Sequence, residues 1–130
     1  MAANNRRLHA LNPEKTEARR EKYKQRLESA EGSHTDSEIY QIRKRLNDLC
    51  FYCGDALQGS GEKDHIVPLS KGGSNWACNI TLACLSCNRD KYNKSVLEFV
   101  QWRQERGLKI SKHCLDYLRL EKRPGAAKKT

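Results

Sequence analysis

The stretch DHIVPLSKGGSNWACN, residues 64–79, joins an acid and a histidine to a short apolar run, and a glycine-containing loop and an asparagine follow. Together with its flanking residues, this stretch predicts a β-hairpin with a long connection. Its three parts are a strand that Pro68 ends, a flexible loop and a second strand, read from KDHIVPL (63–69), SKGGSN (70–75) and CNITL (78–82). Strand periodicity by itself places Asp64 and His65 on opposite faces of the first strand.

Two pairs of cysteines with the same two-residue gap flank this hairpin. They are Cys50 and Cys53 in CFYC, and Cys84 and Cys87 in CLSC. Tetrahedral zinc prefers soft ligands of this kind, and duplicated CxxC turns typically supply them. We therefore predict a structural Zn²⁺ that closes the base of the hairpin, with a disulfide or a redox-active CxxC as the alternative. Cys78 and Cys114 have no partner at this spacing, and we expect both to be small buried residues.

The composition limits the size of the core. Of the 130 residues, 37% are hydrophobic and 32% are charged. The chain is therefore the size of one domain with appendages, and its small core needs a metal or cross-links for stability. The first residues contain no apolar signal region, and no run approaches the roughly 20 apolar residues of a membrane span. We expect a cytoplasmic protein with no membrane partner.

The net charge of +9 is unevenly distributed. Basic residues outnumber acidic ones by 11 to 8 in residues 1–49 and by 12 to 5 in residues 89–130, whereas residues 50–88 carry 2 basic and 3 acidic side chains. A basic periphery around a slightly acidic centre favours binding of a polyanion such as DNA. The alternative is a solvated surface that only keeps the protein soluble.

Two capping boxes predict helices outside the hairpin. TDSE places Thr35 at an N-cap with Glu38 three residues later, and apolar residues at helical spacing follow as far as Leu49. SVLE starts a second helix at Ser95, which Gly107 ends.

Weaker patterns predict three more helical segments. A helix from Pro13 to about Ala30, with Asn12 as its N-cap, has few apolar residues, so we expect it to be exposed. CLSC leads into a short helix, and apolar residues between 110 and 118 indicate a last one. We expect residues 121–130 to be disordered.

The combined pattern resembles the HNH endonuclease family. It consists of CxxC, DHIVPLSKGGS, a following asparagine and TLACLSCNRDK, and it covers about residues 50–94. The resemblance implies an α+β chain with a ββα-metal fold and zinc knuckles, flanked by N- and C-terminal helices. Two strands and a helix would surround one divalent cation, Mg²⁺ or Mn²⁺. The third signature position is Asn88, where the family name expects histidine, so the chain resembles an H-N-N variant.

The resemblance also implies the roles of four residues. His65 would be the general base that activates water, and Asn79 would orient His65 through a hydrogen bond. Asp64 and Asn88 would hold the catalytic metal, and their oxygens favour Mg²⁺ or Mn²⁺ over a transition metal. Histidine suits its role because its reference pKa lies near about 6.5.

Basic side chains after the second cysteine pair are the candidates for phosphate contacts. The expected nucleic-acid-binding residues are Arg89, Lys91 and Lys94, with Lys71 as a weaker candidate. Arg103, Arg106, Lys109 and Lys112 would extend this track.

We interpret the sequence as a small HNH endonuclease that hydrolyses DNA phosphodiester bonds, with RNA as the alternative substrate. The rival interpretations are a catalytically inactive, zinc-stabilised nucleic-acid-binding module and a subunit of a larger nucleic-acid-processing complex. The expected organisation begins with a basic, partly flexible helical extension at residues 1–34 and a packing helix at 35–49. The nuclease domain follows at residues 50–107, and a C-terminal helix with a basic tail at 108–130.

Overall fold

The computed structural model describes residues 13–121 of the chain. The chain divides into two compact units, residues 1–30 and 31–130. In the first unit the described element is α2 (Pro13–Ser29), whose side chains between residues 17 and 26 are all exposed. This exposure agrees with the few apolar residues of its sequence. The expected N-cap, Asn12, and most of the C-terminal tail lie outside the described residues.

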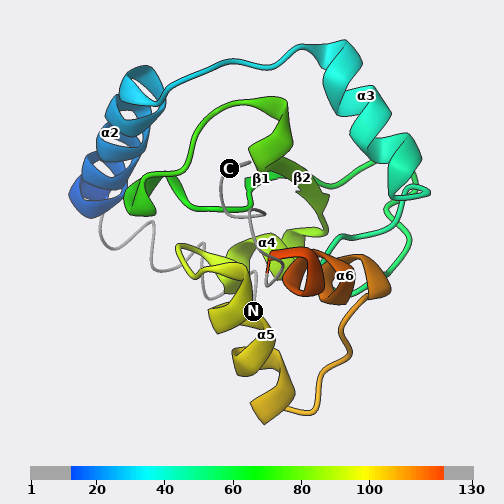
Figure 1. Cartoon of the computed structure of the whole chain (residues 1–130). Helices are drawn as coiled ribbons and strands as arrows, with labels where there is room; N and C mark the ends of the chain where they lie inside the picture. The colour runs from blue at the N-terminus through cyan, green and yellow to red at the C-terminus, as the bar shows by residue number, and fades with distance from the viewer. Residues whose placement is uncertain (1–12, 122–130) are drawn as a thin grey trace. The chain divides into compact units, whose positions relative to one another are not determined.

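The second unit combines helices with a two-stranded sheet, as Figure 1 shows. In chain order its elements are α3 (Asp36–Arg45), β1 (Glu62–His65), the short 3₁₀ turns η1 (Leu69–Lys71) and η2 (Ala77–Asn79), β2 (Ile80–Ala83), α4 (Leu85–Lys91), α5 (Val96–Glu105) and α6 (Lys112–Glu121). The predicted α+β class, a hairpin followed by a helix with further helices on either side, is confirmed. Among the described helices, none combines the length and apolar character that crossing a membrane requires.

The two strands form an antiparallel hairpin in which Glu62 pairs with Ala83 and His65 with Ile80. All four residues of β2 are buried, whereas in β1 only Asp64 is buried. Both strands are shorter than expected, because the ladder ends close to Pro68, which has no N–H group to donate.

Helix α3 begins with the expected capping box. The Thr35 hydroxyl accepts a hydrogen bond from the backbone of Glu38, and the Glu38 carboxylate accepts one from the backbone of Thr35. Ile42, on the apolar stripe, is buried. The helix ends at Arg45, before the predicted Leu49, because residues 47 and 48 have φ values of 55° and 57° and leave the helical region.

The last two helices also begin and end close to the predicted positions. A second capping box joins Ser95 and Glu98 at the start of α5, and Gly107 follows its end with a φ of 68°. At the start of α6 the Ser111 hydroxyl accepts a hydrogen bond from the backbone N–H of Cys114, 3.1 Å away.

Aromatic rings form the centre of the core. The Tyr52 ring makes edge-to-face contacts with Phe51 and Phe99, at centroid distances of 5.0 and 5.2 Å. Cys114 is fully buried among the core residues, as expected. Cys78 is exposed, so its predicted burial is wrong. It lies in η2, before the chain enters the buried strand β2.

Candidate metal centre and active site

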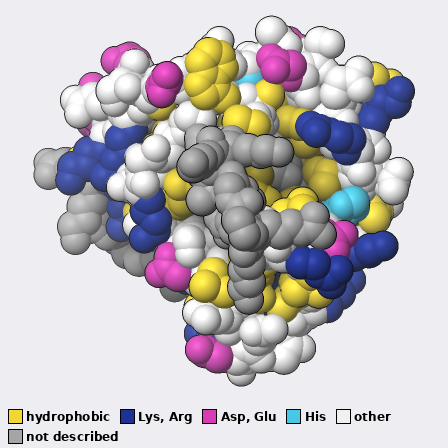
Figure 2. Space-filling view, in the orientation of Figure 1, with side chains coloured by type: hydrophobic (Ala, Val, Ile, Leu, Met, Phe, Trp, Pro, Cys, Tyr) yellow, Lys and Arg dark blue, Asp and Glu magenta, His cyan; other side chains and the backbone are white. Residues whose placement is uncertain are grey.

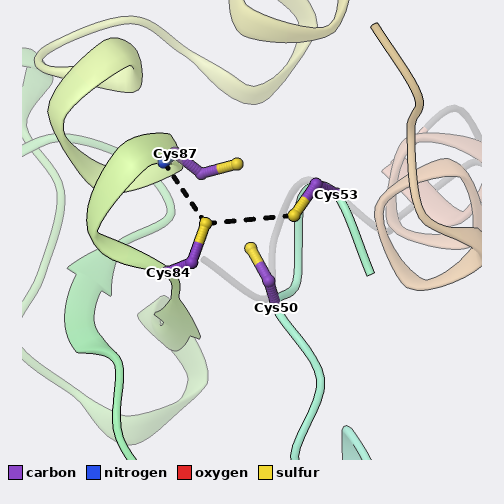
Figure 3. A group of neighbouring side chains, drawn as sticks. All are labelled: Cys50, Cys53, Cys84 and Cys87. Carbon is purple, nitrogen blue, oxygen red and sulfur yellow. Dashed lines mark hydrogen bonds between the residues drawn. The ribbon is translucent and has the colours of Figure 1, made fainter. Parts of the chain in front are cut away.

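Four cysteine sulfurs meet beside the start of α4 and point toward a common centre (Figure 3). Cys50 and Cys53 come from the turn between α3 and β1, Cys84 is the N-cap of α4, and Cys87 lies in its first turn. The Sγ atoms all lie within 4.8 Å of one another, and those of Cys53 and Cys84 are 3.9 Å apart. Zinc–sulfur bonds of about 2.3 Å in a tetrahedron place two sulfurs about 3.8 Å apart. None of the four is in a disulfide, and the cluster fits a structural zinc site.

The chemistry of the four thiols also fits a divalent cation. Contact with Cys87 lowers the pKa of Cys50 to about 4, and the same contact raises the pKa of Cys87. Burial raises the pKa of Cys53 to about 12. Cys50, Cys53 and Cys87 therefore do not all ionise by themselves. A bound divalent cation would let the cysteines of the cluster act as thiolate ligands.

Arg103 supports this cluster from α5. Its Nη1 donates to the Cys87 sulfur over 3.5 Å, and its Nε donates to the carbonyl of Lys109 over 2.9 Å. The side chain is buried, with 6% of its surface exposed. The expectation that Arg103 extends a phosphate-binding track is therefore wrong, because its guanidinium group faces sulfur that carries negative charge when zinc is bound.

The first turn of α4 links the cysteine cluster to Asn88. The backbone N–H of Asn88 donates to the carbonyl of Cys84 over 2.9 Å, so the cluster fixes where the helix starts. The side-chain Nδ2 of Asn88 donates to Oε2 of Glu62 over 2.6 Å. Because the amide nitrogen is held by this carboxylate, the amide oxygen is the atom that Asn88 offers to a cation.

The sequence interpretation did not include Glu62, although its spacing from Asp64 indicated a shared face of the strand. Residues two apart on a strand share a face, so Glu62 and Asp64 project from the same side of β1. The sequence did not show that α4 would lie along this side and bring Asn88 to Glu62. The structure therefore adds a second carboxylate beside the expected metal ligands.

Asp64 takes part in a buried ion pair. Its Oδ2 lies 3.2 Å from the Nζ of Lys91, and the same oxygen accepts a hydrogen bond from the Tyr52 hydroxyl. Burial raises the pKa of Asp64, although Lys91 and Tyr52 act in the opposite direction. Burial also lowers the pKa of Lys91 against the effect of Asp64. Desolvation therefore outweighs the attraction within the pair.

Lys91 does not offer its charge to a phosphate, contrary to expectation. The residue is 0% exposed, and its Nζ also donates to the backbone carbonyl of His65 over 2.9 Å. The ammonium group lies 5.7 Å from the centre of the Tyr52 ring. Lys91 thus joins α4 to the two neighbouring residues of β1 that the sequence placed in the active site.

His65 is hydrogen-bonded to a residue that the sequence interpretation did not select. Its Nε2 lies 2.9 Å from Oδ1 of Asn75, in the loop between the strands. The ring is partly buried. Among residues 13–121 no hydrogen bond joins Asn79 to His65, so the expected bond between these two residues is not formed.

Asn79 instead shapes the connection between the strands. Its Oδ1 accepts from the backbone of Val67 over 2.8 Å, and its Nδ2 donates to the carbonyls of Val67 and Ser74 over 3.0 and 2.8 Å. Its own carbonyl accepts from Ile66, the residue after His65. In the described part of the chain, Asn79 therefore acts on His65 through the backbone of the loop.

The structure places the expected active-site residues on adjoining elements, but their side chains have separate partners. Within residues 13–121, no hydrogen bond or ion pair joins any two of Asp64, His65 and Asn88. Lys91 and Tyr52 contact Asp64, Asn75 contacts His65, and Glu62 contacts Asn88. Lys91 and Asn88 of α4 therefore contact β1 directly, whereas Asn75 reaches His65 from the loop between the strands.

The other expected phosphate-binding residues are at least partly accessible. Arg89 is exposed and lies 3.8 Å from Asp90. Lys94 donates to the carbonyl of Asp90 and lies 5.4 Å from the centre of the Trp102 ring. Lys71 is exposed and lies 3.5 Å from the carboxylate of Glu98. Figure 2 shows Lys and Arg side chains at several places on one face of the molecule, among hydrophobic and acidic side chains.

Comparison with protein families identifies this region. The model of the HNH endonuclease family matches residues 50–94, a range that begins at Cys50 and contains both cysteine pairs, the hairpin and α4. Comparison with curated proteins finds no match. The match confirms the resemblance drawn from the sequence, and it indicates a nuclease-type or nucleic-acid-binding function.

Proposed function

We propose that the protein is a metal-dependent endonuclease that hydrolyses phosphodiester bonds in DNA, because residues 50–94 match the HNH endonuclease family. The observation that supports this most is the position of the signature residues. Asp64 and His65 lie on β1, and Asn88 lies in α4, which packs along that strand and is fixed by the cysteine cluster. RNA is the alternative substrate.

Each step of the hydrolysis has a candidate residue. A phosphodiester is cleaved by a deprotonated water in line with the leaving oxygen, and His65 is the proposed general base. Its ring is partly buried and held by Asn75, so it has a defined direction. Arg89, Lys94 and Lys71 are proposed to hold the phosphate backbone, because their side chains remain partly or fully accessible.

Asp64 and Asn88 are the proposed ligands of a catalytic Mg²⁺ or Mn²⁺. Their carboxylate and amide oxygens are the donors that these cations prefer. One contact in the structure fits this assignment: Glu62 holds the amide nitrogen of Asn88, which leaves the amide oxygen for the cation. The bound cation would supply charge neutralisation at the phosphoryl group.

The test is cleavage of supercoiled plasmid by the zinc-loaded protein in Mg²⁺ or Mn²⁺, with EDTA as the negative control. Zinc content is measured after the EDTA incubation, because loss of the structural metal would also stop cleavage. His65→Ala and Asn88→Ala are each expected to abolish cleavage while the circular dichroism spectrum and zinc content stay unchanged. Gln101→Ala, at an exposed amide on α5, is the matched control. Nicking by His65→Ala at the wild-type rate would refute the base assignment.

A second candidate is a zinc-stabilised nucleic-acid-binding module without catalysis. The buried ion pair favours it, because the Asp64 carboxylate already has Lys91 and Tyr52 as partners. A gel-shift assay separates the two: this candidate binds DNA or RNA, and the bound nucleic acid stays intact in both Mg²⁺ and Mn²⁺.

We further propose a cytoplasmic location and association with a larger nucleic-acid-processing complex. The exposed side chains of α2, outside the HNH domain, are the surface proposed for such an association. Co-purification of nucleic-acid-processing proteins with this chain, compared with a variant in which the exposed Arg19, Arg20 and Lys24 are changed to Ala, tests this proposal.

A further inference from the structure

The backbone of Asn75 is fixed by a segment that lies outside the HNH-matched range. Its N–H donates to the carbonyl of Glu31 over 2.8 Å, and its carbonyl oxygen lies 2.8 Å from Nδ1 of His34. A carbonyl can only accept, so His34 carries its proton on Nδ1. Its Nε2 is then an acceptor, and Lys63 donates to it from 3.2 Å. One tautomer of His34 therefore satisfies both contacts.

The next loop residue packs against the same segment. A Cβ atom on Gly32 would lie 2.4 to 2.6 Å from three ring atoms of Trp76, closer than any side chain allows. Gly32 also has a φ of 95°, a conformation that favours glycine. The residues 31–34, which we call the strap, thus hold the loop at both Asn75 and Trp76.

The side chain of Asn75 is left to act on His65. Its Oδ1 lies 2.9 Å from Nε2 of the His65 ring. An amide oxygen only accepts hydrogen bonds, so Nε2 must carry a proton. In the neutral ring the unprotonated nitrogen is then Nδ1, which is the atom able to accept a proton from water.

We propose that Asn75 is a positioning residue that fixes the tautomer and direction of the His65 ring, and that the strap holds Asn75 in place for this task. The proposal rests on the proposed function for the role of His65 as the base. It assigns the Nδ1 atom as the base and gives residues before the HNH-matched range a part in the active site.

The contacts of Asn75 allow its side chain to be tested apart from its backbone. The strap binds the backbone N–H and carbonyl, and His65 contacts only the side chain. Asn75→Leu, which removes the acceptor at similar size, is expected to lower kcat about 10- to 100-fold with little change in KM. Asn75→Asp keeps an acceptor oxygen and is expected to recover most of kcat. Gln101→Ala is the control.

A spectroscopic readout that needs no cleavage accompanies the kinetics. Long-range ¹H–¹⁵N NMR spectra of the zinc-loaded protein are expected to show a protonated Nε2 and an unprotonated Nδ1 for His65. In Asn75→Leu the Nε2 proton is expected to exchange faster with water and lose its signal. A protonated Nδ1 in the wild type, or wild-type kcat in Asn75→Leu, would overturn the role of Asn75.

The strap has its own variants. Gly32→Val places carbon atoms where the Trp76 ring lies, and His34→Ala removes the donor to the Asn75 carbonyl. Both variants are expected to lower kcat while the zinc content stays unchanged. The control Ser37→Ala, at an exposed residue of α3, is expected to leave kcat unchanged. Wild-type kcat in both strap variants would overturn the part assigned to the strap. If the wild type itself cleaves nothing, the proposed function fails, and the NMR spectra still report whether Asn75 sets the His65 tautomer.

Discussion

Changing Lys91 to Met is expected to destabilise the protein strongly, because it leaves the Asp64 carboxylate buried without its cation. The two groups are 3.2 Å apart, and the side chains are 0% and 7% exposed. At an effective dielectric constant of about 20, charges at this distance attract by about 5 kcal/mol. Burial acts against both charges, as the raised pKa of Asp64 and the lowered pKa of Lys91 indicate. The net loss on removing one partner is therefore expected to be about 3 to 5 kcal/mol.

The double variant Asp64→Asn with Lys91→Met separates this explanation from simple loss of packing. It removes both charges, and the asparagine oxygen can still accept from the Tyr52 hydroxyl. We expect the free energy of unfolding of the double variant to be within about 2 kcal/mol of the wild-type value. A difference remains because methionine cannot replace the hydrogen bond from Lys91 to the His65 carbonyl. Lys112→Met, at an exposed position, is the control and is expected to change stability by less than about 0.5 kcal/mol.

Urea unfolding of the zinc-loaded proteins, followed by circular dichroism, measures these differences. With a slope of about 2 kcal/mol per molar urea, the single variant shifts the midpoint down by about 1.5 to 2.5 M. Burial raises the pKa of Asp64 in the folded state, so the folded state binds a proton more tightly than the unfolded state. Stability of the single variant should therefore recover as the pH falls from 8 to 5. A single variant as stable as the wild type, or a double variant no more stable than the single, would refute the reasoning.

Four further outcomes are expected. Cys87→Ser is expected to remove the structural zinc from the four-cysteine site and to unfold the protein, whereas Cys78→Ser, at an exposed residue, is expected to keep the metal; metal analysis and circular dichroism measure both. Ser95→Ala removes the cap of α5 and lowers the free energy of unfolding by about 1 kcal/mol in urea titrations. The hydrogen bonds with Ser95 lower the pKa of Glu98. The ionised Glu98 carboxylate therefore contributes to stability above about pH 4.5, and this contribution is lost as the pH falls further. Glu98→Gln is expected to flatten this part of the acid-unfolding curve. Glu62→Ala frees the Asn88 amide to rotate and raises the Mg²⁺ concentration needed for half-maximal cleavage, while DNA binding without metal is unchanged.

Features set by neighbouring residues could be predicted from the sequence. Capping boxes and CxxC turns depend on side chains three residues apart, so Thr35, Ser95 and the cysteine pairs appeared where they were expected. The hairpin was also predicted, because Pro68 limits its first strand and buried residues mark its second.

The partners of the polar side chains could not be predicted. Lys91 and Arg103 are basic residues at plausible phosphate-binding positions, and only the packing of α4 and α5 turns them inward. Asn75 and Glu62 became relevant because the connection folds back on His65 and α4 lies along β1. Such contacts join residues 10 to 26 positions apart, and local patterns carry no information about them.

The hydrogen bonds of Asn79 have a practical consequence for protein engineering. They connect Val67 to Ser74 through the Asn79 side chain, so the residues between Val67 and Ser74 form a loop whose two ends are held together. Gly73 must stay small, because a Cβ there would lie 1.8 Å from the Val67 carbonyl oxygen. Gly72 faces open space, but its φ of 85° favours glycine, so this residue is kept and the insertion is placed beside it. A short peptide tag or a fluorophore attachment site inserted next to Gly72 would therefore extend into solvent while both strands keep their register.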